Sequence, residues 1–214
     1  MARPGGHRAR TRAAAVMLLA GSLLLSGCGL LSGPRPLSED APLVMEVTSP
    51  AVTRGILPAK FTCYATSAVQ TPPVAWSGAP AHTRSYVLIL DDADAPITPW
   101  VYWLVFNIGA ATTYIQANNL PPGARVARNS TGKPAGYDPP CPSGAPHRYR
   151  ITVYALNDVL GNLTPPTDPN LLQTWTAIAP HVLARGTMNV TACPAPAQAV
   201  KFPGCKTAGA DPRR

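Results

Sequence analysis

The 214-residue chain contains 26 Pro and 17 Gly, and hydrophobic residues make up 46% of it against 13% for charged residues. The frequent Pro argues against a bundle of long helices, because each Pro inside a helix costs about 3 kcal/mol, and the apolar fraction argues against disorder. The formal net charge of +8 lies mostly near the two ends, since residues 43–192 hold nine Lys/Arg against seven Asp/Glu. We therefore expect no nucleic-acid partner.

The N-terminal residues have the pattern of a bacterial lipoprotein signal. Four Arg precede the apolar run Ala13–Leu25, whose 13 residues are too few to span a bilayer, because a spanning helix needs about 20. The run fits a signal-peptide core, and the sequence Leu-Ser-Gly-Cys that ends at Cys28 resembles a lipobox. We expect residues 1–27 to be removed, Cys28 to carry palmitate-type acyl chains, and residues 28–42 to form a flexible tether.

This prediction also places the mature protein. Two acyl chains on Cys28 give stable anchoring, whereas a single chain binds a membrane only weakly. We expect an exported protein that this lipid anchor holds on the outer face of the bacterial cell membrane. The alternative is an ordinary signal peptide in which Cys28 is incidental.

The remaining four cysteines predict two disulfides, because an even number in an exported chain is typical of a disulfide framework. Three connectivities are possible. Cys193 and Cys205 enclose a short Pro- and Gly-containing segment and are expected to pair locally, and Cys63 would then pair with Cys141. No Cys/His spacing indicates zinc, and we predict neither a metal nor another cofactor. Residues 193–214 are expected to form a loosely packed tail pinned by its disulfide.

Six runs have the character of β-strands. They are Leu43–Thr48, Val74–Trp76, Ser85–Asp91, Val101–Ile108, Arg148–Leu156 and Gly186–Thr191. Clusters of Pro, Gly, Asn and Ser separate them, which favours an antiparallel sandwich. The runs Ser85–Leu90 and Val101–Phe106 are almost wholly apolar, so we expect them to be central strands covered on both faces.

One helix is predicted near the C-terminal end of the domain. Asp168 can cap it, Pro169 suits its first turn, and apolar side chains recur at helical spacing as far as Ile178. Pro180 should end this helix and begin a second short turn that continues to Ala184.

Three segments contain side chains that could bind a ligand or take part in catalysis. They are the acidic run Asp91–Pro96, the aromatic run Trp100–Trp103, and the Pro-rich run Gly136–Gly144 with His147–Tyr149 after it. Because alternate strand residues share a face, we expect Tyr102 to face the same way as Trp100, with Trp103 on the opposite side. By the same rule His147 and Tyr149 lie together and Arg148 faces away.

In their order along the chain, these segments resemble the bacterial form of the phosphatidylethanolamine-binding protein family, also called the Raf-kinase-inhibitor-like family. The matching motifs are Phe61–Cys63, Pro72–Pro80, Asp92–Pro96, Trp103–Ile108, the Pro-rich loop, His147–Tyr149 and His181–Ala184. The resemblance implies an all-β fold, a two-sheet antiparallel Greek-key sandwich with one or two short C-terminal helices, over residues 43–192.

The resemblance also implies a pocket for a small anion, such as a phosphate, a carboxylate or a phospholipid headgroup. Its expected lining is Asp92, Trp100 at the mouth, Tyr102, Pro140, His147 and Tyr149. A carboxylate beside His147 would favour the imidazolium form, which attracts anions. Arg148, on the opposite face, is expected to pair with Asp94 instead.

The chain departs from the family pattern in places that bear on this pocket. Tyr102 stands where the family usually has a histidine, which removes one possible cation and predicts weaker anion binding. In the loop, Pro139 replaces a usual glycine and Ser143 a usual proline, so the backbone donors of the loop are expected to differ.

These observations favour a membrane-anchored, non-enzymatic binding protein. The first alternative is an inhibitor or scaffold for a protein partner of the protease or kinase type, as some relatives are. The second is a hydrolase that uses His147 and Asp92 with a serine, but Ser130 and Ser143 lie in no motif typical of a nucleophile.

Overall fold

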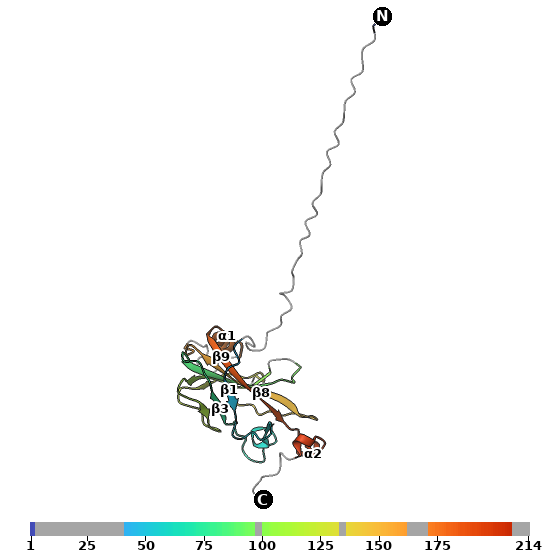
Figure 1. Cartoon of the computed structure of the whole chain (residues 1–214). Helices are drawn as coiled ribbons and strands as arrows, with labels where there is room; N and C mark the ends of the chain where they lie inside the picture. Colours follow the sequence, from blue (N-terminus) through green and yellow to red (C-terminus); the bar gives the residue numbers. More distant parts are fainter. Residues whose placement is uncertain (3–40, 97–99, 133–135, 162–170, 207–214) are drawn as a thin grey trace. The chain divides into compact units, whose positions relative to one another are not determined.

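The computed structural model describes residues 1–2, 41–96, 100–132, 136–161 and 171–206 (Figure 1). The predicted signal peptide, the acylated Cys28, most of the tether and the helix cap at Asp168 lie outside these residues and stay predictions. In the described part of the chain, no helix has the length and apolar character needed to cross a membrane.

A six-stranded sheet forms the centre of the fold. Its strands lie in the order β2 (Ile56–Leu57), β9 (Val182–Ala192), β8 (His147–Leu156), β4 (Ser85–Asp92), β5 (Trp100–Gly109) and β7 (Arg125–Val126). β2 runs parallel to β9, and the other neighbours are antiparallel. Every residue of β4 is buried, as its apolar sequence predicts.

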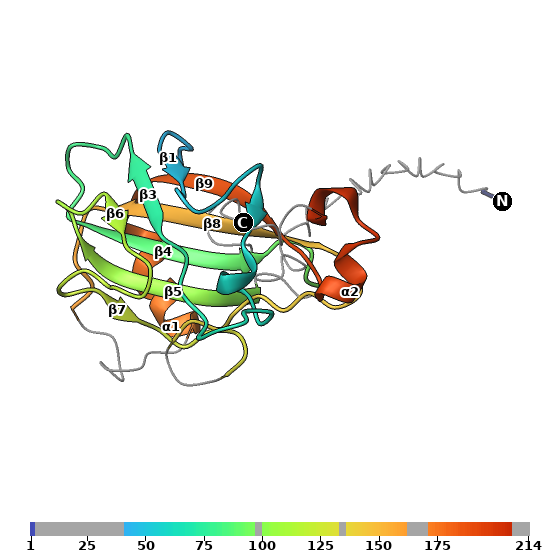
Figure 2. The ribbon, with the colours of Figure 1, turned by 90° about the horizontal axis from the view of Figure 1, so that it is seen from below.

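A smaller sheet and a helix cover the two faces of the large sheet. The smaller sheet contains β1 (Glu46–Thr48), β3 (Val74–Ser77) and β6 (Tyr114–Ile115) in that order. Figure 2 shows it on one side of the large sheet and α1 (Leu171–Ile178) on the other. The predicted two-sheet sandwich with a C-terminal helix is therefore confirmed.

Strand alternation divides the apolar side chains of the large sheet between two core clusters. The cluster between the sheets joins Leu88 of β4 and Val153 of β8 to Trp76 of the smaller sheet. The cluster on the far face joins Ile89 of β4 to Ile178 of α1. Because both faces are covered, β4 needs apolar residues at every position of its centre.

The segment after α1 differs from the prediction. Pro180 lies in a 3-10 turn, η2 (Ala179–His181), as expected of a helix-ending residue, but no helical turn continues to Ala184. Instead β9 begins at Val182, which pairs with Leu156 of β8. The expected turn is wrong because the β8 ladder already offers hydrogen-bonding partners to this backbone.

Two cysteine pairs fix the loops at one end of the sandwich. The disulfides are Cys63–Cys141 and Cys193–Cys205, the connectivity expected from the sequence. Cys63 follows the 3-10 turn η1 (Ala59–Phe61). The tail after β9 contains two further helical turns that the sequence did not predict, α2 (Pro196–Ala199) and η3 (Pro203–Cys205).

A β-bulge changes which residues of β5 face the inter-sheet core. Trp103 pairs with Leu90, but Val101 pairs with Asp91, so Tyr102 is an extra residue in the ladder. An extra residue reverses the alternation locally, and Trp103 and Tyr102 consequently both pack into the cluster between the sheets. The expectation that Trp103 faces away from Tyr102 is therefore wrong.

Candidate functional site

The candidate site lies at one edge of the large sheet, where the end of β4 lies between the starts of β5 and β8. Asp92 is the last residue of β4, and it pairs with Trp100 at the start of β5 and with Tyr149 near the start of β8. Residues directly opposite each other in a sheet share a face, and His147 lies on that face because it is two residues from Tyr149. The strand register therefore brings these side chains together from distant parts of the sequence.

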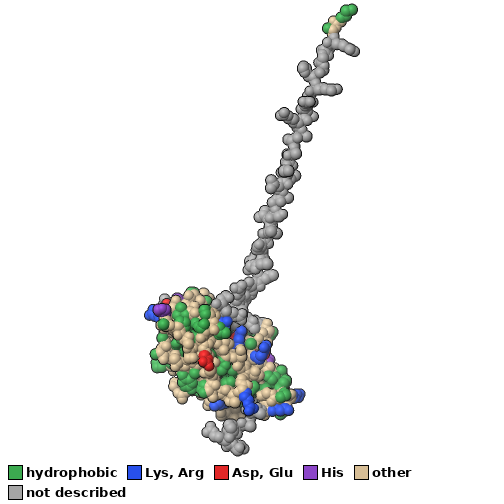
Figure 3. Space-filling view, in the orientation of Figure 1, with side chains coloured by type: hydrophobic (Ala, Val, Ile, Leu, Met, Phe, Trp, Pro, Cys, Tyr) green, Lys and Arg blue, Asp and Glu red, His purple; other side chains and the backbone are tan. Residues whose placement is uncertain are grey.

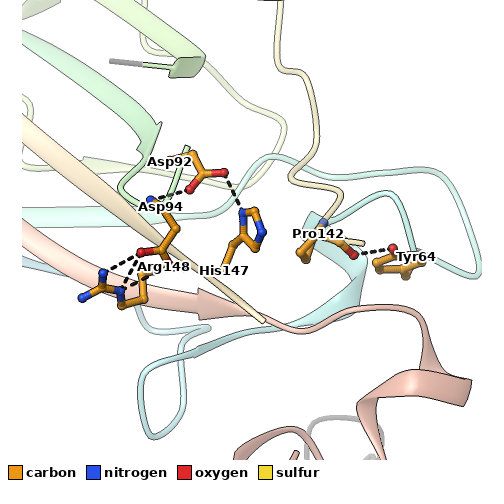
Figure 4. Close-up of polar contacts among 6 residues, drawn as sticks. All are labelled: Tyr64, Asp92, Asp94, Pro142, His147 and Arg148. Atoms are coloured by element: carbon orange, nitrogen blue, oxygen red, sulfur yellow. Dashed lines mark hydrogen bonds and ion pairs between the residues drawn. The ribbon is translucent and has the colours of Figure 1, made fainter. Parts of the chain in front are cut away.

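Asp92 holds His147 in a fixed orientation. Oδ2 of Asp92 lies 3.0 Å from Nδ1 of His147, and Oδ1 accepts a 2.8 Å hydrogen bond from the backbone N–H of Asp94 (Figure 4). The Asp92 side chain is 4% exposed and that of His147 33%. Since the carboxylate accepts the proton of Nδ1, the other ring nitrogen, Nε2, is left for a ligand.

Two tyrosines stand beside this pair. Tyr102 and Tyr149 pack edge to face with ring centroids 5.5 Å apart, and the Tyr149 ring lies 6.4 Å from the ring of His147. Burial raises the pKa of both tyrosines, and the charge of Asp92 raises it further, so both phenols stay protonated and can donate hydrogen bonds.

The hydroxyl of Tyr149 is the unusual group of the site. Tyr149 is only 1% exposed, and its oxygen is buried without a well-formed hydrogen bond among the described residues, although the Tyr102 hydroxyl is close enough to interact with it. Leaving a buried hydroxyl unpaired costs about 1–3 kcal/mol. Such a group next to a half-exposed imidazole is satisfied when a ligand supplies the missing acceptor.

The Pro-rich loop that follows the site is held against the region of η1. Besides the Cys63–Cys141 disulfide, the N–H of Cys63 donates to the carbonyl of Pro140 at 3.0 Å, and the Tyr64 hydroxyl donates to the carbonyl of Pro142 at 2.6 Å (Figure 4). Tyr137 donates its hydroxyl proton to the carbonyl of Phe61. Pro140 is thus buried in a loop that hydrogen bonds and a disulfide hold both before and after it.

The opposite face of β8 carries two arginine–aspartate pairs. Arg148 donates from Nε to Oδ1 of Asp94 at 2.9 Å, and its guanidinium is the main reason that the pKa of Asp94 is lowered. This pair was expected from the sequence. Arg150 donates from Nε and Nη2 to Asp91, whose pKa burial raises despite the nearby guanidinium. This second pair was not predicted.

The structure thus places the predicted site residues as follows. Side-chain contacts join Asp92, His147, Tyr102 and Tyr149, the register adds Trp100, and Pro140 lies in the clamped loop. Tyr137 was missed, although it packs edge to face on Trp103 at 5.6 Å and ties the loop to η1. Its place in the Pro-rich run was the only available signal.

Among the described residues, the serines of the hydrolase alternative are not hydrogen-bonded to His147. Ser130 accepts a 2.8 Å hydrogen bond from the N–H of Val101, and His147 makes its hydrogen bond to Asp92 rather than to Ser130 or Ser143. Within the described ranges, no three His, Cys, Asp or Glu side chains are grouped so that they could hold a metal ion.

Comparisons with known proteins agree with this architecture. A UPF0098 protein from Chlamydia trachomatis is 33% identical over 150 residues, which is 65% of this chain and 93% of that protein. A UPF0098 protein from Methanothermobacter thermautotrophicus is 38% identical over 112 residues, which is 50% of this chain and 72% of that protein.

Solved structures and a family model give the same result. A putative phosphatidylethanolamine-binding protein homologue from Chlamydia trachomatis superposes with a TM-score of 0.60 at 30% identity, over 69% of this chain and 96% of that one. Escherichia coli YbcL gives a TM-score of 0.59 at 28% identity, over 70% and 98%. The sequence model described as phosphatidylethanolamine-binding protein matches residues 48–192. The chain therefore belongs to the phosphatidylethanolamine-binding protein family.

Proposed function

We propose that this chain is a non-enzymatic binding protein whose site at the ends of β4, β5 and β8 takes a small anionic group. The group is a phosphate or a carboxylate, and it includes the phosphate of a phospholipid headgroup. Family membership supports a ligand-binding role. The observation that carries the proposal is His147, which buried Asp92 fixes through Nδ1 while a third of its side chain stays exposed.

The donors of this site match an oxyanion. In the imidazolium form, Nε2–H of His147 makes a charge-assisted hydrogen bond, which is roughly twice as strong as a neutral one. The buried hydroxyl of Tyr149 can donate a second bond in place of its weak interaction with the Tyr102 hydroxyl. The Asp92 carboxylate lies on the Nδ1 side of the ring, which leaves Nε2 for the anion.

Thermal unfolding of histidine variants tests this proposal. Phosphoethanolamine, and more weakly inorganic phosphate, should raise the melting temperature of the wild type, because a ligand that binds only the folded state stabilises it. The shift should vanish in His147→Ala and persist in His82→Ala, a matched control at an exposed histidine. A His147→Ala protein that keeps the full shift would contradict the proposal.

The pH dependence of binding gives a second test. Histidine is the side chain that ordinarily changes charge between about pH 5 and 8, so affinity should fall as the pH rises across this range. Glycerophosphoethanolamine is the suitable probe because its phosphodiester keeps one negative charge throughout. Calorimetric titrations of the wild type should show this fall, and an affinity that is constant across the range would contradict a role for the imidazolium.

The proposal includes attachment to the membrane through Cys28. Its support is the Arg-bearing, apolar N-terminal sequence that ends in the lipobox-like Leu-Ser-Gly-Cys. The intact mass of protein expressed in a bacterial host should correspond to loss of residues 1–27 and addition of acyl chains, and Cys28→Ser should abolish both changes. A mature mass without acyl chains would contradict the lipid anchor and would support the alternative of an ordinary signal peptide.

A further inference from the structure

A cavity lies between η1 and the C-terminal tail, and none of the residues assigned to the anion site lines it. Its volume is about 220 Å³, and its walls include Leu57, Ala59, Tyr64, Pro194, Val200 and Lys206. A volume of this size corresponds to about seven water molecules at their share of the liquid, ~30 Å³ each. The cavity can therefore hold a hydrocarbon chain of about seven atoms but is too small for a drug-sized ligand.

The tail that forms one wall is an addition to the family domain. The family match ends at residue 192, and the Cys193–Cys205 disulfide closes the segment that follows. Within it, Phe202 donates its N–H to Ala199 at 3.0 Å and Cys205 donates to Phe202 at 2.9 Å. Consecutive turns and a covalent closure give this wall a fixed shape.

The hydroxyl groups of the cavity wall are already paired. Thr62 donates its hydroxyl proton to the carbonyl of Ala59 at 2.9 Å, and the hydroxyl of Tyr64 is bonded to Pro142. What remains for a ligand is apolar surface from aliphatic and proline side chains, including Val200, which is 60% exposed. Such a surface binds a hydrocarbon group, because burial removes it from water.

A positive charge stands at the edge of this apolar surface. Lys206 is exposed and belongs to the cavity wall, and the described part of the tail, residues 193–206, contains no Asp or Glu. Lys206 has no ion-pair partner among the described residues. Figure 3 shows hydrophobic and basic side chains beside each other over α2. Charge and apolar walls together select an amphiphile with a negative end.

We propose that this cavity binds a single free acyl chain with an anionic end, as in a medium-chain fatty carboxylate. The chain lies against the apolar walls, and the carboxylate pairs with Nζ of Lys206. About seven chain atoms fill the cavity, and longer chains continue into solvent past Val200. The site is separate from the proposed anion site at His147 and does not depend on it.

Titrations with a homologous series test this proposal. Affinity should rise roughly three- to fourfold for each added CH₂ from hexanoate to octanoate, as the burial of one methylene predicts, and should rise little from octanoate to decanoate. Octylammonium should bind more weakly than octanoate, because its head repels Lys206. Absence of saturable octanoate binding below its micelle concentration, or equal binding of octylammonium, would overturn the proposal.

Variants separate the two ends of the ligand and the two sites. Lys206→Gln should weaken octanoate binding without changing octanol binding, Ala199→Trp should block both, and His147→Ala should change neither. Loss of octanoate binding in His147→Ala would mean that the ligand occupies the anion site, which would overturn the proposal.

Amide chemical-shift mapping on the wild type locates the ligand without any substitution. Octanoate should move the amide signals of Ala59 and Val200 and leave those of Asp92 and His147 in place. The opposite pattern contradicts the proposal. So do shifts at Ala59 and Val200 that change with protein concentration alone, because a second copy of the chain would then be the occupant.

Discussion

The two faces of β8 both carry a basic side chain paired with an aspartate near the start of the strand, yet they differ in what remains available for binding. On one face His147 uses one ring nitrogen for Asp92, and the buried hydroxyl of Tyr149 has only a weak interaction with Tyr102 among the described residues. On the other face Arg148 and Arg150 each donate hydrogen bonds from two guanidinium nitrogens to an aspartate. The first face therefore has hydrogen-bond donors available for a ligand, whereas the guanidinium donors of the second face already bind aspartate side chains of the protein.

This difference shows how a binding site can be separated from a structural ion pair. A charged side chain in itself indicates neither, since both faces have an aspartate and a basic partner. Unsatisfied donors next to a fixed, half-exposed ring mark the binding face, because such donors cost free energy until an acceptor arrives. The predictions below test that separation, from the largest effect to the smallest.

Asp91→Ala should have the largest effect, and on stability alone. The substitution removes the acceptor of two Arg150 nitrogens in a pair whose aspartate side chain is 6% exposed. Breaking a fully buried pair costs about 3–5 kcal/mol, and because Arg150 is 27% exposed we expect about 1–3 kcal/mol. Chemical denaturation measures the loss.

The control for Asp91→Ala is the double variant with Arg150→Met, which should recover most of the lost stability because two charges are then absent rather than one. Phosphoethanolamine affinity should match that of the wild type in both variants. A large drop in affinity would mean that the two faces of β8 are not separate.

Tyr102→His should strengthen binding on the other face. Tyr102 packs against Tyr149 and lies near Asp92. A second imidazole adds a possible cation close to the anion, and one charge-assisted hydrogen bond corresponds to about a tenfold gain in affinity. Calorimetry at about pH 6, where imidazoles are substantially protonated, measures it. An unchanged affinity would show that this position does not face the ligand.

Tyr149→Phe should change stability and binding in opposite directions. Removing a buried hydroxyl that has no well-formed hydrogen bond should stabilise the ligand-free protein by about 1 kcal/mol, because its weak interaction with Tyr102 does not offset the cost of burying it. The same change removes one donor to the anion, so affinity should fall about fivefold. Tyr86→Phe, at another buried tyrosine of the same core cluster, is the comparison. A Tyr149→Phe protein that is less stable than the wild type would contradict the inference that its hydroxyl awaits a ligand.

The pair of Arg148 with Asp94 should give the smallest effect, visible only in acid. Because Arg148 holds the pKa of Asp94 below its usual value of 3.8, the pair stabilises the protein above that value and loses this contribution as pH falls through the lowered pKa. Arg148→Ala should remove this part of the acid dependence, and the effect is small because the pair is exposed. Denaturation curves at several acidic pH values measure it, and a large loss of stability at neutral pH would contradict it.

Asp91 should contribute with the opposite sign in the same measurements. Burial raises its pKa, so the folded state keeps a proton that the unfolded chain has released, and stability falls as pH rises above 3.8. Replacing Asp91 should flatten this part of the pH profile.

Much of the site followed from local sequence patterns. Alternation along β8 placed His147 with Tyr149 and Arg148 opposite them, because a regular strand has a strict period of two. The apolar runs identified β4 and β5 as central strands, and the even number of cysteines after Cys28 favoured the disulfides that the structure contains.

Other features depend on tertiary structure and have no local signal. The bulge at Tyr102 arises from how β5 pairs with β4, so Trp103 was assigned to the wrong face. The start of β9 at Val182 depends on its partner Leu156. Two-residue strands such as β2 (Ile56–Leu57) are too short to show a period.

Nuclear magnetic resonance of the His147 ring nitrogens most directly tests whether this imidazole holds the anion. On titration with phosphoethanolamine, the Nε2 signal of His147 should shift and saturate together with the calorimetric signal, while the ring signals of His82 and His181 stay in place. Saturation of the ligand with an unmoved His147 signal would contradict the account.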